Sequence, residues 1–184
     1  MTTARAFLRV RASQCGSISR IITEMNRHLA MDFLNTGRFM TLFYLSINRE
    51  DQSLRWVRAG HDAALVYDPD TDRFEELMGT GLALGVDRNF VYEEYLKTGL
   101  HPGQIIAVGT DGIWETCNRN GEMFGKLRFR EVIRENAKQS ADQIIEAVYN
   151  ELNRFKMGLK QADDITLVVI KLKASPGAAN DWQI

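Results

Sequence analysis

Apolar side chains recur at helical spacing near both ends of the chain. At the N-terminal end, an amphipathic helix is predicted to begin after Ser17, a suitable N-cap, and to end at Gly37, which suits a left-handed C-cap. Its apolar positions follow i, i+3, i+4 and i+7 spacing: Ile18, Ile21, Ile22, Met25, Leu29 and Phe33. Farther along, a helix is predicted over residues 126–137, and a capping box of Ser140 and Gln143 starts another.

Between these helices the pattern changes to short apolar or alternating runs bounded by turn residues, which is typical of β-strands. Strands are predicted over residues 39–47, 54–59, 64–67, 74–77, 90–96, 104–109 and 165–172. Polar turns over residues 48–53 and 68–72 predict two hairpins. Helices segregated from antiparallel strands indicate an α+β fold, and strands that are apolar on both faces predict two stacked sheets with helices outside.

Composition narrows the class of protein. The chain has 184 residues, a hydrophobic fraction of 45% and a formal net charge of -1, which fit one globular domain and exclude wholesale disorder. Balanced charge gives no electrostatic basis for nucleic-acid binding. Apolar runs are too short to span a membrane, and no signal peptide is visible. The only cysteines, Cys15 and Cys117, form no disulfide framework, so we expect a cytoplasmic protein.

Two acidic motifs are the first candidates for chemistry. Asp111 follows an apolar strand and precedes Gly112, while Asp163 and Asp164 directly precede the last strand. If those strands are antiparallel neighbours, the end of one lies beside the start of the other. Clustered carboxylates repel unless a proton or a cation bridges them, and oxygen donors favour Mg²⁺, Mn²⁺ or Ca²⁺. The alternative is that all three are ordinary surface-turn aspartates.

A second candidate is His61, which stands between Gly60 and Asp62 at a predicted bend. A His–Asp pair is suited to acid–base chemistry, but no serine or cysteine nucleophile motif accompanies it. A structural role in the turn is therefore the favoured interpretation.

The order and spacing of seven motifs resemble one family. They occupy residues 39–43, 58–61, 82–86, 102–104, 109–115, 124–125 and 163–167. This pattern is similar to the PPM-type, metal-dependent serine/threonine phosphatases, in the bacterial branch of stage II sporulation protein E and RsbU. The resemblance covers nearly the whole chain and implies an α-β-β-α sandwich of two antiparallel sheets flanked by helices.

For the complete domain, the resemblance also implies a site with two Mn²⁺ or Mg²⁺ ions, at which a metal-bound water attacks phosphorus in line. In this chain alone, metal binding is expected to be weak or absent and the protein inactive. Asp111 and Asp163 match metal-binding positions of the family, and Asp164 would be a supporting or alternative ligand. Gly112 and His61 would support the site without binding metal. The implied substrate is a phosphorylated STAS-domain protein, an anti-sigma-factor antagonist, and an upstream sensor or receiver domain is expected in the parent protein.

One part of the family pattern is missing. The family's first metal ligands come from an Asp–Gly on an early strand that is followed by a Gly-His-Gly segment. Neither occurs here, so the chain is expected to lack the first strands of the domain. Residues 1–173 are assigned to the phosphatase domain and residues 174–184 to a flexible tail. The alternative function is a catalytically inactive fragment or pseudophosphatase that serves protein interaction. Sheet edges left exposed by the missing strands would favour a homodimer.

Overall fold

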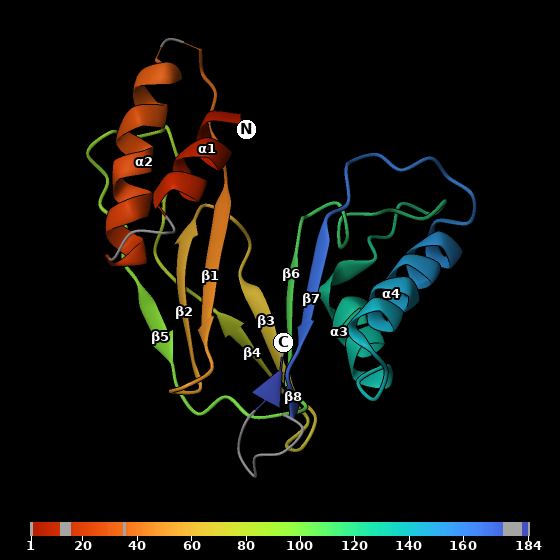
Figure 1. The fold of residues 1–184 in the computed structure, drawn as a ribbon. Helices are drawn as coiled ribbons and strands as arrows, with labels where there is room; N and C mark the ends of the chain where they lie inside the picture. The colour runs from red at the N-terminus through yellow and green to blue at the C-terminus, as the bar shows by residue number, and fades with distance from the viewer. Residues whose placement is uncertain (1, 12–15, 35, 175–181, 184) are drawn as a thin grey trace. The chain divides into compact units, whose positions relative to one another are not determined.

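The computed structural model describes residues 2–11, 16–34, 36–174 and 182–183. It contains helices and antiparallel sheets (Figure 1). The chain divides into two compact units, and each is described by itself. The first unit comprises Met1–Ala63 and Met78–Gly99, and the second comprises Ala64–Leu77 and Leu100–Ile184.

The first unit combines two helices with a three-stranded antiparallel sheet, ordered β1-β2-β5. Its elements are α1 (Thr2–Arg11), α2 (Ile18–Asp32), β1 (Leu42–Asn48), β2 (Ser53–Ala59) and β5 (Tyr95–Lys97). The apolar face of α2 packs on the sheet, where Ile22 and Met25 share a core with Val57 of β2. The predicted hairpin across residues 48–53 is confirmed, because β1 pairs with β2 from Leu42↔Ala59 to Asn48↔Ser53.

Two predictions for the first unit are wrong. Helix α2 ends at Asp32 with Phe33 as its C-cap, so Gly37, although its φ is +66°, belongs to a later turn. Of the strand expected over residues 90–96, only the last two residues are in a strand, as part of β5 (Tyr95–Lys97). Tyr92 leaves strand geometry because its N–H donates to the Thr23 hydroxyl oxygen at 3.1 Å, and its ring is buried in the core.

The second unit is built on a four-stranded antiparallel sheet, ordered β4-β3-β6-β7. Its main elements are β3 (Ala64–Asp68), β4 (Arg73–Leu77), β6 (Ile105–Gly109), α3 (Gly125–Glu135), α4 (Ala141–Lys156) and β7 (Leu167–Lys171). Helices α3 and α4 lie beside one face of this sheet (Figure 1). Alternate residues of β3 and β6 share a buried core with residues of the two helices. The strands contribute Leu65, Tyr67, Ile105 and Ala107, and the helices contribute Phe129, Ile133, Ile144 and Val148.

The helix cap and the hairpin that the sequence predicts in the second unit are confirmed. The capping box at the start of α4 is formed, with the Ser140 hydroxyl accepting from the Gln143 N–H and the Gln143 side chain accepting from the Ser140 N–H. The hairpin of β3 and β4 forms across residues 69–72. At the boundary of the segment expected to be a tail (residues 174–184), β8 (Lys173–Ala174) pairs with β9 (Trp182–Gln183), and residues 175–181 and 184 lie outside the described part.

The fold class is therefore confirmed as α+β, with two larger antiparallel sheets, the short β8–β9 pair and flanking helices. No helix in the described ranges is long and apolar enough to cross a membrane. Of the two cysteines, Cys117 is exposed with a free thiol, and Cys15 lies outside the described residues.

Candidate functional site

The pairing of β6 with β7 brings the two acidic motifs together, as the sequence predicts. The strands are antiparallel, and Gly109 at the end of β6 faces Leu167 at the start of β7. Thr110 extends the pairing: its N–H donates to the Thr166 oxygen at 3.0 Å, and its hydroxyl accepts from the Thr166 N–H at 2.9 Å. The segments that carry Asp111 and Asp164 therefore begin side by side at one edge of the sheet.

Gly112 allows these segments to approach more closely than a side chain would permit. A Cβ atom at this position would lie 2.4 Å from the backbone oxygen of Asp164 and 3.4 Å from that of Asp163. Gly112 is itself buried. Its role in the site is thus a close backbone contact between the two acidic motifs.

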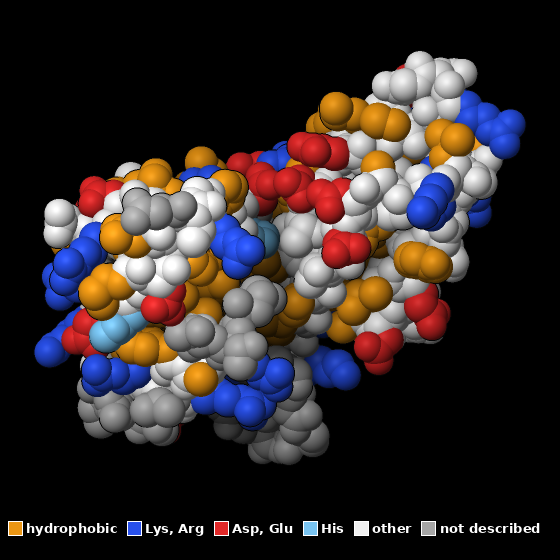
Figure 2. Space-filling model, turned by 90° about the horizontal axis from the view of Figure 1, so that it is seen from above, with side chains coloured by type: hydrophobic (Ala, Val, Ile, Leu, Met, Phe, Trp, Pro, Cys, Tyr) orange, Lys and Arg blue, Asp and Glu red, His pale blue; other side chains and the backbone are white. Residues whose placement is uncertain are grey.

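The three aspartate side chains are exposed to solvent. One oxygen of Asp111 accepts from the Gly112 N–H at 3.0 Å, and one oxygen of Asp163 accepts from the Asp164 N–H at 2.7 Å. These local hydrogen bonds orient the two carboxylates. Figure 2 views the molecule from above Figure 1, and acidic side chains (red) are visible on that face.

The donor chemistry of this edge suits a hard divalent cation, although the ligand atoms of Asp111, Asp163 and Asp164 do not all lie within 4.8 Å of one another in the described part of the chain. The donors are carboxylate oxygens on two adjacent segments, and Mg²⁺ and Mn²⁺ prefer such oxygens to nitrogen or sulfur. The backbone contact at Gly112 keeps the two segments close together.

Two polar residues that sequence reasoning missed support this edge. The hydroxyl of Thr116, a residue only 5% exposed, donates to the Gly112 oxygen at 2.7 Å. The Gln161 amide donates to the same oxygen at 3.3 Å and to the Thr116 hydroxyl at 3.0 Å. The position of Gln161 two residues before Asp163 was visible in the sequence, but its contact with Gly112 depends on the path of the loop.

His61 belongs to the first unit, whereas the aspartates belong to the second. Its Nδ1 atom lies 3.0 Å from the backbone oxygen of Asp62, and its ring meets Phe43 edge-on at a centroid distance of 6.4 Å. The preceding Gly60 has a φ of +70°, and a Cβ there would lie 2.8 Å from the Ala83 backbone. These contacts give His61 a local role at the end of β2.

A further cluster of metal-ligating side chains lies in the second unit. Ligand atoms of Asp68, Asp70 and His101 all lie within 4.8 Å of one another. No other group of three such side chains does so within the described ranges. One Asp68 oxygen accepts from the Asp70 N–H at 3.0 Å, and the other lies 3.2 Å from His101 Nε2 and 3.5 Å from Gln104 Nε2. Both oxygens therefore have protein partners without an ion.

The pKa of Asp68 agrees with the pairing of its carboxylate by protein groups. Partial burial alone would raise the pKa of Asp68, but the hydrogen bonds from the Asp70 backbone and from His101 outweigh it and hold the pKa below its ordinary value of 3.8. The Asp68 carboxylate is therefore charged and paired with His101 in a polar network that joins the end of β3 to the turn before β6.

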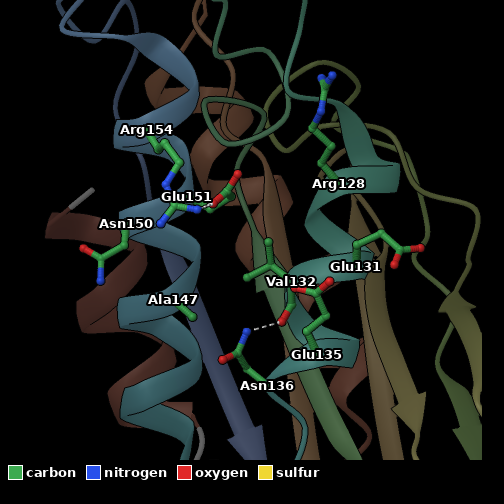
Figure 3. A pocket seen from close by; sticks show the side chains of 9 residues that line it. All are labelled: Arg128, Glu131, Val132, Glu135, Asn136, Ala147, Asn150, Glu151 and Arg154. Carbon is green, nitrogen blue, oxygen red and sulfur yellow. Dashed lines mark hydrogen bonds and ion pairs between the residues drawn. The ribbon is translucent and has the colours of Figure 1, made fainter.

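A cavity of about 570 Å³ opens between α3 and α4, as Figure 3 shows. Its lining mixes charges: Glu151 pairs with Arg154 at 2.8 Å, while Glu131 and Arg128 project from α3. None of the predicted site residues lines this cavity.

Comparison with known sequences gives one family. The family described as Stage II sporulation protein E (SpoIIE) matches residues 1–173. The chain is 25% identical over 155 residues to phosphoserine phosphatase RsbU of Bacillus subtilis (strain 168), covering 84% of this chain and 45% of that protein. It is 27% identical over 146 residues to protein IcfG of Synechocystis, covering 79% and 22% respectively. The chain thus spans less than half the length of these two relatives.

Solved structures share the fold. The SiaA-PP2C domain of Pseudomonas aeruginosa superposes with a TM-score of 0.77 at 21% identity, covering 92% of this chain and 66% of that one. The PP2C phosphatase domain of SpoIIE from Bacillus subtilis, solved with a fragment of its regulatory domain, gives 0.76 at 19% identity, covering 94% and 50%. Both comparisons indicate the same α+β arrangement of antiparallel sheets and flanking helices.

Proposed function

The chain belongs to the Stage II sporulation protein E family, and from this premise we propose that it is a metal-dependent protein serine/threonine phosphatase module of a bacterial signalling regulator. The observation that carries the proposal is the β6–β7 register, which sets Asp111 beside the Asp163–Asp164 segment. Membership of the family supports the reaction class, and the meeting of the two acidic segments at one edge of the sheet supports the location proposed for the site.

Asp111 and Asp163 are proposed to hold Mn²⁺ or Mg²⁺, with Asp164 as an alternative ligand. A bound divalent cation lowers the pKa of a coordinated water and neutralises charge that develops on the phosphoryl group. The protein contributes the placement of the donors: Thr110 fixes the strand ends, and Gly112 permits the close approach. Because the three carboxylates are exposed, a phosphorylated side chain of another protein can reach them from solvent.

The proposed substrate is a phosphoserine or phosphothreonine of a STAS-domain protein that antagonises an anti-sigma factor. Support comes from the relative RsbU, whose name identifies it as a phosphoserine phosphatase. Because the curated relatives are much longer than this chain, we further propose that it acts beside an upstream sensor or receiver domain. Self-association as a homodimer is part of the same proposal.

The test is Mn²⁺-dependent phosphate release from a phosphorylated STAS-domain protein. Asp111→Asn is expected to lower the rate by about 100-fold or more, because a neutral amide is a poorer ligand and several kcal/mol of transition-state stabilisation are lost. Asp142→Asn, which alters another exposed aspartate of the second unit, is the matched control and should keep the wild-type rate. Wild-type turnover in Asp111→Asn would refute the assigned role, and no release by the unaltered protein would favour the non-catalytic interaction module.

A further inference from the structure

A small polar network connects the turn that carries Asp111 to the loop that carries Asp163. In this network the Gly112 carbonyl accepts from two side chains, the Thr116 hydroxyl at 2.7 Å and the Gln161 amide at 3.3 Å. The Gln161 amide also donates to the Thr116 hydroxyl at 3.0 Å, which closes a three-membered cycle. The network thus includes Gly112, which directly follows Asp111, and Gln161, which lies two residues before Asp163.

The orientation of the Gln161 amide follows from its partner. The Gly112 carbonyl can only accept a hydrogen bond, so the NH₂ group of Gln161 must face it, and a flipped amide would set two acceptor oxygens against each other. In this orientation the Gln161 Oε1 atom is buried and has no hydrogen-bond partner within the described part of the chain. Burying an unpaired acceptor costs free energy, whereas an apolar side chain of similar shape would avoid that cost.

From this combination we infer that Gln161 is a positioning residue for the metal site, an inference that rests on the proposed function. Its amide ties the Asp111 turn to the Asp163 segment, so that the two carboxylates keep a fixed separation. The backbone contact at Gly112 sets how close the segments come, and the Gln161 amide limits how far they separate. Gln161 acts through Asp111 and Asp163 and does not itself bind the metal.

The test compares Gln161→Met with the unaltered protein. Methionine keeps the length and the apolar stem but removes the NH₂ donor, so both hydrogen bonds of the amide are lost. We expect the Kd for Mn²⁺, measured from the electron paramagnetic resonance signal of free Mn²⁺, to rise by about tenfold, since two modest hydrogen bonds are broken. In the metal-free protein, amide hydrogen exchange over residues 112–116 should accelerate, because the turn is released. Gln139→Met, on the exposed turn after α3, should change neither quantity.

The two measurements separate the failure of this inference from that of the proposed function. If the unaltered protein takes up no Mn²⁺, the proposed function fails, and exchange in the metal-free protein alone decides whether Gln161 ties the segments. Faster exchange with an unchanged Kd would overturn the positioning role and leave a merely structural one. Unchanged exchange and unchanged Kd would overturn the whole inference. If Gln161→Met does not fold, Thr116→Val is tested instead, because it removes the hydroxyl of the same network. This variant is expected to raise the Kd for Mn²⁺, and an unchanged Kd would overturn the inference.

Discussion

Replacing Gly112 by alanine tests the close approach of the two acidic motifs. The added Cβ would lie 2.4 Å from the Asp164 backbone oxygen, whereas an ordinary contact begins at 3.4 Å. The segments must therefore separate by about 1 Å, because the opposing atom is backbone and cannot rotate away. A displacement of about 1 Å in a reacting site can cost about 100-fold in rate, and overpacking of this kind costs about 1–3 kcal/mol of stability.

The assay pairs Mn²⁺-dependent phosphate release with urea unfolding of the same preparations. Gly112→Ala should lose about 100-fold in rate at temperatures where the protein remains folded. Gly16→Ala is the matched control, because a Cβ at Gly16 meets nothing within 4 Å. If Gly112→Ala kept both the rate and the unfolding midpoint of the unaltered protein, the segments would not be in the contact described, and the reasoning from Gly112 would be refuted.

Two further predictions concern the second unit. Ser140→Ala removes the hydroxyl that caps α4, so the free energy of unfolding should fall by about 1 kcal/mol in urea titrations, and an unchanged value would show that the capping box contributes nothing. Asp68→Asn should be less stable than the unaltered protein at neutral pH. The pKa of Asp68 is lower in the folded state, so its contribution is present above the ordinary value of 3.8 and is lost as the pH falls through the lowered pKa. Unfolding measured across that range should show the two proteins converging, and a constant difference would contradict the assignment of charge to Asp68.

Elements whose signals are local could be predicted from the sequence. The capping box of Ser140 depends on residues within one helical turn, and the hairpin of β3 and β4 depends on a turn of Pro and Asp residues. The neighbouring positions of Asp111 and Asp163 were also predictable, because the antiparallel pairing of two apolar strands fixes which ends meet.

Features set by distant partners could not be predicted. Residues 90–94 have the composition of a strand, but the Tyr92 N–H bonds to Thr23, 69 positions away. The amide of Gln161 reaches Gly112 only because of the path of the loop between α4 and β7. The pairing of His101 with Asp68 likewise joins two turns that are 33 residues apart. Sequence periodicity carries no information on such contacts, which depend on the folded chain.

The proposed metal site is tested most directly by locating the ion. Crystals of the protein soaked in Mn²⁺ should give an anomalous scattering peak between the carboxylates of Asp111 and Asp163, and the peak should disappear in Asp111→Asn. A Mn²⁺ peak confined to Asp68 and His101, or the absence of any peak at the end of β6 under conditions that support phosphate release, would contradict the proposed site.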